Sequence, residues 1–238
     1  MDLASTVIRD RRIAASEETR TRQRSRETGE LGYIYGAGES SRARRSAAEG
    51  HGFDRTADQI TTVVLHQTAG PRFFGSLIMS DDAAVESDHP IDRIAAHFVI
   101  TDDGDAMYTH DVQYILSNAG GRSGIDIEVA GSFSSTQEPS GQRISLAAIR
   151  TCRRLISDLV LAIPSISRIH PHGQVQRLPA GSDRHHGDKF DSCCGPDIWV
   201  NVGRWAVETL RLDCESTLGY PNHGISPRQT NEAYRQPI

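Results

Sequence analysis

The sequence predicts an α/β fold in which a mixed β-sheet is flanked by helices on both faces. Short β-branched runs alternate along the chain with longer amphipathic stretches, which is typical of a sheet covered by helices. An Asp-Asp-Gly sequence at 102–104 also predicts a tight hairpin between two strands. Because hairpins join antiparallel strands and helical crossovers join parallel ones, we expect both kinds of pairing in one sheet.

The first two predicted strands precede the hairpin, and the first of them ends in a histidine. The run TTVVLH, residues 61–66, is expected to form a buried strand that ends at His66. IAAHFVI, residues 94–100, is expected to be the next strand, and the chain should return antiparallel after the hairpin through residues 106–109.

GIDIEVAG, residues 124–131, predicts a strand with two different faces. Side chains alternate along a strand, so the isoleucines and the valine share one face while Asp126 and Glu128 share the other. A glutamate in the middle of a strand is costly to bury, so a partner or a chemical role is expected for Glu128. A position facing water on an edge strand is the equally weighted alternative.

Two helices and one more strand are predicted in the second half of the chain. Residues 144–163 place apolar side chains at three- and four-residue steps, and Pro164 ends this helix. SISRIH is expected to be a short strand that brings His172 to the sheet edge. Residues 199–212 form the last predicted helix. Its expected core positions are Trp199, Val202, Trp205 and Leu210.

The two ends of the chain differ in composition from the middle. Residues 1–55 are charged and rich in arginine, which predicts a flexible extension, and residues 213–238 predict a loose tail around a central domain at 56–212. A net charge of −5 in 238 residues gives no case for binding nucleic acid or membranes. The N-terminus lacks the apolar stretch of a secretory signal, so we expect synthesis in the cytoplasm without a signal peptide.

Two histidines and one cysteine, far apart in sequence, form a candidate metal site. His66 and His172 each follow a strand-like run, and Cys193 lies in the loop segment DKFDSCCGPDIW before a Gly-Pro turn. Two imidazoles and one thiolate are a ligand set of catalytic zinc sites that keep one position open for water. The alternative is a closed structural zinc site. It would use Cys193, Cys194, His185 and His186.

Six motifs between residues 61 and 212 resemble, in order, those of a known family. They are VVLHQTAG, AAHFVITDDGDAMY, SNAGG, GIDIEVAG, PHGQV and CCGPDIW. The segment is similar to the amidase-2 group, which comprises N-acetylmuramoyl-L-alanine amidases and peptidoglycan recognition proteins. This resemblance implies a zinc-dependent hydrolase that cleaves the amide bond between N-acetylmuramic acid and L-alanine. Peptidoglycan or a muropeptide would be its substrate, reached after lysis or dedicated export.

The resemblance also implies roles for single residues. The metal ligands would be His66, His172 (rather than His170) and Cys193, with Zn²⁺ as the cofactor. Some family members use a tyrosine as general base at the place that Ala96 holds here. The resemblance therefore assigns the role of general base to Glu128, which would take a proton from the attacking water.

Other positions depart from the family pattern. In many members a lysine two residues before the third ligand stabilises the oxyanion, but Asp191 occupies that place here. Lys189, two residues further from Cys193, is therefore the candidate catalytic cation. Its alternatives are Arg184, His185 and His186. Thr68 and Asn118 are candidate substrate contacts, Asn118 standing where the family has a histidine. His97 is expected to be structural or to support a metal ligand.

Three other functions remain open at this point. A peptidoglycan-recognition module would have the fold without catalysis, whereas a phage endolysin or an exported antibacterial toxin would share the chemistry. The sequence gives no indication of the oligomeric state.

Overall fold

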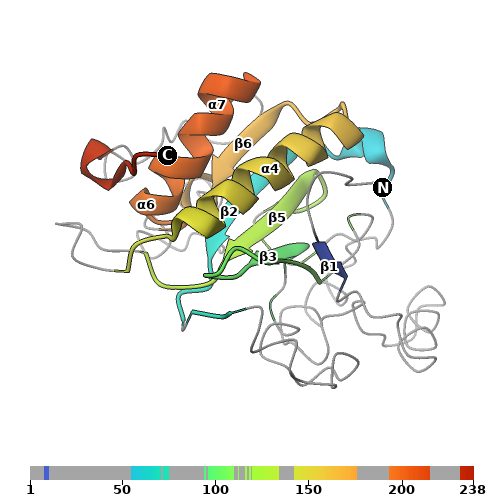
Figure 1. Cartoon of the computed structure of the whole chain (residues 1–238). Coiled ribbons are helices and arrows are strands. Elements are labelled where there is room, and N and C mark those ends of the chain that lie inside the picture. The colour runs from blue at the N-terminus through green and yellow to red at the C-terminus, as the bar shows by residue number, and fades with distance from the viewer. Residues whose placement is uncertain are drawn as a thin grey trace, which may run out of the picture.

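The computed structural model shows a single mixed sheet with helices packed against it (Figure 1). The residues that it describes are 8–10, 55–70, 72–74, 94, 96–109, 112, 116, 118, 120–133, 142–175, 193–214 and 231–238. Within these ranges the sheet has six strands in the order β1-β4-β3-β5-β2-β6. The predicted α/β class is confirmed.

Five of the six strands lie at or near the predicted runs, whereas the strand at Ile8–Asp10 lies in the segment predicted as a flexible extension. Their bounds are β1 (Ile8–Asp10), β2 (Thr62–Gln67), β3 (Phe98–Ile100), β4 (Ala106–Tyr108), β5 (Gly124–Val129) and β6 (Arg168–Pro171). Strands β3 and β4 are antiparallel and flank the predicted hairpin, whereas the other neighbouring pairs are parallel. Strand β3 is shorter than the predicted 94–100, and β2 and β5 are buried along their whole length.

Helix α4 (Leu146–Ala162) confirms the most regular pattern in the sequence. Its N-cap residue is Ser145, whose hydroxyl accepts a hydrogen bond from the backbone nitrogen of Ala148 at 3.0 Å. The apolar stripe of the helix is buried, from Ala148 to Leu159. The helix stops just before Pro164, which cannot continue it.

The last helical region has three parts instead of the single helix predicted at 199–212. Helix α6 (Pro196–Ile198) leads into a π-helical turn, η4 (Trp199–Gly203), and then into α7 (Arg204–Leu210). Trp199 is fully buried at the start of this turn. A side chain at Gly203 would meet the Trp199 ring, with Cβ 2.2 Å from the nearest ring carbon. The π turn thus forms where a glycine lets the backbone lie on a tryptophan ring.

We expect Gly203→Ala to lower the free energy of unfolding by about 1–3 kcal/mol, the usual effect of overpacking a close-packed core. The added methyl group would press against a buried ring that has no room to move. Urea denaturation followed by tryptophan fluorescence measures this change. Wild-type stability in the variant would show that the ring shifts freely.

One apolar cluster joins the helices to the sheet. Side chains of α4, η4 and α7 pack in it with Leu65 of β2 and Ile127 of β5. The predicted alternation in β5 is confirmed, because Ile125, Ile127 and Val129 all belong to this cluster. Asp126 and Glu128 therefore project from the opposite face of the sheet.

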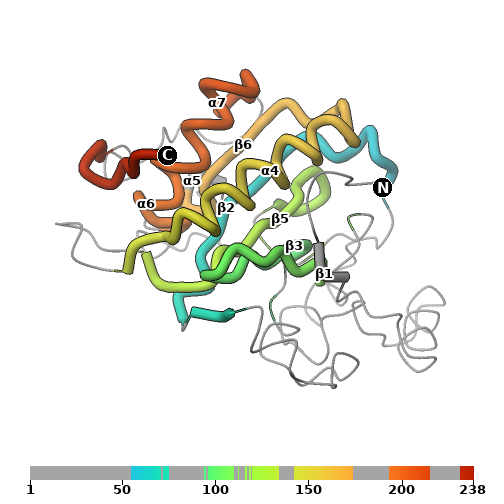
Figure 2. Tube along the Cα trace, in the orientation of Figure 1, coloured from blue at the N-terminus to red at the C-terminus, as the bar shows by residue number. Residues whose placement is uncertain are grey.

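Two segments outside the predicted 56–212 domain also contact it. Strand β1 pairs with β4 at one edge of the sheet. At the other end of the chain, residues 231–238 lie beside α6 and α7 (Figure 2), and Tyr234 is only 3% exposed. The Tyr234 carbonyl accepts hydrogen bonds from Asn201 at 2.8 Å and from Arg143 at 2.6 Å. These eight residues are anchored rather than loose, while the predicted segment boundaries stay a prediction.

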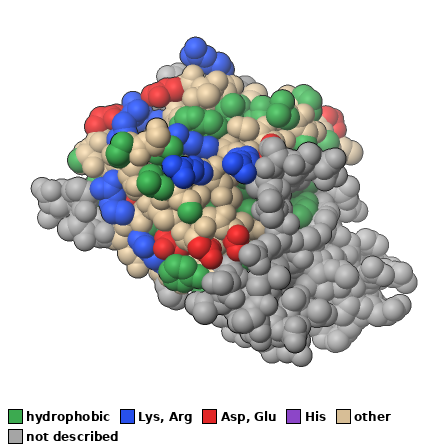
Figure 3. All heavy atoms as spheres, in the orientation of Figure 1, with side chains coloured by type: hydrophobic (Ala, Val, Ile, Leu, Met, Phe, Trp, Pro, Cys, Tyr) green, Lys and Arg blue, Asp and Glu red, His purple; other side chains and the backbone are tan. Residues whose placement is uncertain are grey.

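Arginine side chains gather on the outer face of the helical layer (Figure 3). Arg150 and Arg154 of α4 are exposed there, and Arg204 of α7 pairs with Glu208 and Glu232. None of the described helices is both long and apolar enough to span a membrane.

Candidate metal centre

The register of three parallel strands brings the candidate residues to one edge of the sheet. His66 of β2 lies directly opposite Glu128 of β5. On its other side, β2 pairs with β6, and the last paired residues are Leu65 and Pro171. The residues that follow them in the two strand segments are His66 and His172. His172 begins the short helix α5 (His172–Val175). Parallel pairing therefore explains how side chains more than a hundred residues apart become neighbours.

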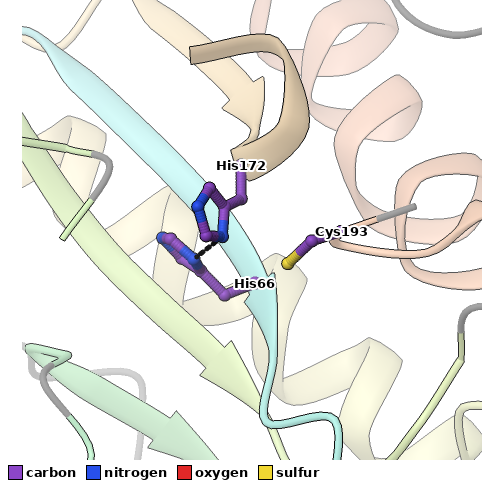
Figure 4. Close-up of side chains that lie close together, drawn as sticks. All are labelled: His66, His172 and Cys193. Carbon is purple, nitrogen blue, oxygen red and sulfur yellow. Dashed lines mark hydrogen bonds between the residues drawn. The ribbon is translucent and has the colours of Figure 1, made fainter. Parts of the chain in front are cut away.

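Cys193 completes a group of three close ligand atoms (Figure 4). One ligand atom from each of His66, His172 and Cys193 lies within 4.8 Å of the other two, and all three residues are buried. The Nδ1 atoms of the two histidines face each other at 3.0 Å. The backbone nitrogen of Gly173 donates to the Cys193 carbonyl at 2.8 Å, which fixes the cysteine loop against the start of α5.

The two histidine nitrogens lie near the separation that a tetrahedral zinc ion requires. Two imidazole nitrogens bound to tetrahedral zinc are about 3.3 Å apart, given zinc–nitrogen bonds of about 2.0–2.1 Å. The observed 3.0 Å between the Nδ1 atoms needs only a small adjustment to reach this separation. Nitrogen and thiolate donors are also the set that zinc prefers over magnesium or calcium.

The surroundings of His66 favour positive charge. Burial alone would lower the pKa of His66, but hydrogen bonds to Asp126 and Cys193 and the negative charge of Glu128 raise it to about 10. A group that holds its proton this strongly lies in a negative electrostatic potential. The same potential attracts a metal cation.

Glu128 is placed beside the ligand group without belonging to it. Its Oε1 lies 3.9 Å from Nδ1 of His66, and the residue is only 5% exposed. Of the two alternatives for this glutamate, the buried position with a partner is observed, and the exposed edge position is not. A carboxylate at this distance can reach a small molecule bound at the three ligand atoms.

The two adjacent cysteines have different environments. Cys193 contributes to the three-ligand group, whereas the thiol of Cys194 contacts the Gly195 carbonyl at 3.7 Å and is completely buried. Burial raises the pKa of Cys194 well above its ordinary value, and repulsion from Cys193 acts in the same direction. Cys194 therefore stays a neutral thiol of the core.

Of the remaining predicted site residues, Thr68 and Asn118 are described by the structure and the candidate cations are not. The hydroxyl of Thr68 accepts a hydrogen bond from the Gly131 nitrogen at 2.9 Å and lies 3.3 Å from the Gly131 carbonyl oxygen, so it joins two loops at the sheet edge. Asn118 lies in the turn before β5, where its carbonyl accepts from the Gly121 nitrogen. The substrate roles of both residues stay a prediction. Lys189 and its alternatives Arg184, His185 and His186 lie outside the described residues.

Three buried polar residues behind His66 extend the site. Asp126 Oδ1 accepts a hydrogen bond from Nε2 of His66 at 2.9 Å. His97 lies next to Asp126, with its Nδ1 3.0 Å from the Asp126 backbone nitrogen, and its Nε2 is 3.1 Å from Nη2 of Arg55. The two roles expected for His97, structural or supporting a metal ligand, stay a prediction. The alternation of β5 signalled Asp126, but nothing in the sequence singled out Arg55.

A family model described as N-acetylmuramoyl-L-alanine amidase matches residues 56–188 of this chain. The match spans His66, Glu128 and His172 and ends before Cys193. No curated protein matches the sequence.

Solved structures of amidases and recognition proteins show a distant similarity. The endolysin N-acetylmuramoyl-L-alanine amidase LysCS from Clostridium intestinale is 12% identical with a TM-score of 0.42, over 69% of this chain and 93% of that one. Drosophila peptidoglycan recognition protein SD is 14% identical with a TM-score of 0.42, over 57% of this chain and 82% of that one. The family assignment rests on the sequence match, which covers more than half of the chain. The chain belongs to the N-acetylmuramoyl-L-alanine amidase family known as amidase-2.

Proposed function

We propose that the protein is a zinc-dependent amidase that cleaves the bond between N-acetylmuramic acid and the L-alanine of the peptidoglycan stem peptide. The observation that carries this proposal is the convergence of His66, His172 and Cys193, with Glu128 beside them. Family membership supplies the substrate class. The geometry contributes three grouped ligand atoms for a metal ion and a carboxylate that can accept a proton.

Each residue has a distinct task in this proposal. His66, His172 and Cys193 would hold the ion, and zinc bound there supplies a Lewis acid for attack of water on the amide carbonyl. Glu128 accepts the proton of the attacking water and returns it to the leaving amine. Its nearly complete burial excludes bulk water from competing for that proton.

The buried position of Glu128 favours the enzyme over a recognition module. A domain that only binds peptidoglycan needs neither an ion nor a proton acceptor beside it. Here a buried carboxylate lies 3.9 Å from a ligand nitrogen, an arrangement that is costly to keep without chemical use. The amidase is therefore the favoured function, and the recognition module is the second candidate.

We expect the purified protein to contain about one equivalent of zinc and to release new L-alanine amino termini from purified peptidoglycan. Metal analysis and amino-terminal labelling measure the two properties. A chelator should abolish release, and added zinc should restore it. His172→Ala, which removes a ligand, is the matched inactive control.

Two outcomes would contradict the amidase. Release that persists in the chelator-treated, metal-free protein would exclude metal-assisted hydrolysis. Tight peptidoglycan binding by the zinc-loaded protein without any release would favour the recognition module.

A further inference from the structure

The carboxylate of Asp126 holds the metal-facing histidine from behind. Asp126 is fully buried, and its Oδ1 lies 2.9 Å from Nε2 of His66. The other ring nitrogen, Nδ1, is the one that faces His172. A carboxylate only accepts hydrogen bonds, so the proton of a neutral His66 is placed on Nε2. Nδ1 is then left with a free lone pair for a metal.

Asp126 is itself held from two directions. The backbone nitrogen of Gly120 donates to Oδ1 at 2.9 Å, and a side chain at Gly120 would place a Cβ 2.9 Å from both carboxylate oxygens. Glycine at 120 is thus required for the turn to approach the carboxylate. On the other side, Nδ1 of His97 accepts a hydrogen bond from the Asp126 backbone nitrogen at 3.0 Å and lies 3.7 Å from Oδ2.

Arg55 supplies a positive charge behind His97. Its guanidinium contacts His97 Nε2 at 3.1 Å and donates to the carbonyls of Val112 at 2.8 Å and Arg122 at 2.8 Å. Burial lowers the pKa of Arg55 to about 10 against the attraction of Asp126 and Tyr108, so the group remains cationic at neutral pH. Arg55, His97, Asp126 and His66 form a continuous buried polar chain.

We propose that Asp126 is a positioning residue of the metal centre, which fixes the ring orientation and tautomer of His66 and is itself held by Gly120 and His97. This role rests on the proposed metal centre. Asp126 is not one of the three grouped ligand residues. It acts through His66, as carboxylates do behind many metal-bound histidines.

The test compares metal binding by the full-length wild type with that of Asp126→Asn. Asparagine keeps the shape and can still accept from His66 and Gly120 through one oxygen, but it removes the negative charge. We expect zinc affinity, measured by competition with a chromophoric chelator, to fall roughly 10- to 100-fold. The visible absorption bands of the cobalt-substituted protein should also shift, because the ligand strength of His66 changes.

Asp197→Asn is the matched control. Asp197 is an equally buried aspartate that accepts from a backbone nitrogen, Ile144 at 2.6 Å, and from Arg143 at 3.2 Å, and it makes none of the contacts to His66. This variant should lose stability in urea while zinc affinity and the cobalt spectrum stay as in the wild type. A purely structural role for Asp126 would make the two variants behave alike.

A second variant, Gly120→Ala, keeps Asp126 and all three ligands but places a Cβ against both carboxylate oxygens and the Cα of Gly124. It should weaken zinc binding in the same direction, and it carries the test if Asp126→Asn does not fold. Wild-type affinity and an unchanged cobalt spectrum in a folded Asp126→Asn or Gly120→Ala protein would overturn the positioning role alone. A wild-type protein that binds no zinc would overturn the metal centre together with this role.

Discussion

Replacement of Glu128 by glutamine is expected to abolish turnover while zinc stays bound. Glutamine has nearly the same volume and can still accept a hydrogen bond, but it cannot take a proton from water. Positioned general bases contribute typically 10²–10⁴-fold to rate, so we expect a loss of roughly that size in kcat. Release of L-alanine amino termini from peptidoglycan measures the rate.

Metal content separates the role of Glu128 from that of the ligands. Glu128 is not one of the three grouped ligand residues, so Glu128→Gln should retain its equivalent of zinc, whereas His172→Ala should lose it. A wild-type rate in Glu128→Gln would remove this residue as the base. Loss of zinc in the glutamine variant would instead make Glu128 a fourth ligand.

The sequence predicted those parts of the fold and the site that follow from periodicity. Alternation in β5 placed Asp126 and Glu128 on one face, and the stripe of α4 placed its buried side chains correctly. The strand-ending histidines converge because parallel pairing aligns the ends of β2 and β6. These features depend on residues that are close together in sequence or on one simple register.

Other features depend on distant contacts that no local pattern encodes. Arg55 falls in the segment predicted as a charged extension, yet it is buried. Its carbonyl partners, Val112 and Arg122, lie more than fifty residues away in the sequence, so no local pattern predicts this burial. The π-helical turn at Trp199–Gly203 was likewise missed, since it requires the ring of Trp199 to lie on the backbone of Gly203. Residues 231–238 pack partly through the Tyr234 carbonyl, which accepts from Asn201 and Arg143, and a backbone carbonyl carries no sequence signal.

Replacement of Cys193 by serine is expected to cause loss of zinc under conditions in which Cys194→Ser retains it. Serine removes the sulfur that lies with His66 and His172, and a neutral hydroxyl is a poor zinc ligand. Loss of a direct ligand should lower zinc affinity by more than the roughly 100-fold upper range for residues that only support ligands. Equilibrium dialysis followed by metal analysis gives both affinities.

The neighbouring cysteine makes this comparison unusually sharp, because Cys194→Ser changes the same atom type one residue away. The Cys194 thiol is fully buried in the apolar cluster, so a hydroxyl there should lower the free energy of unfolding by about 1–3 kcal/mol without altering zinc affinity. Cys193→Ser should thus change affinity and Cys194→Ser should change stability. If the affinities rank the other way, the third ligand is Cys194, and the loop before α6 must then turn its second thiol toward the two histidines.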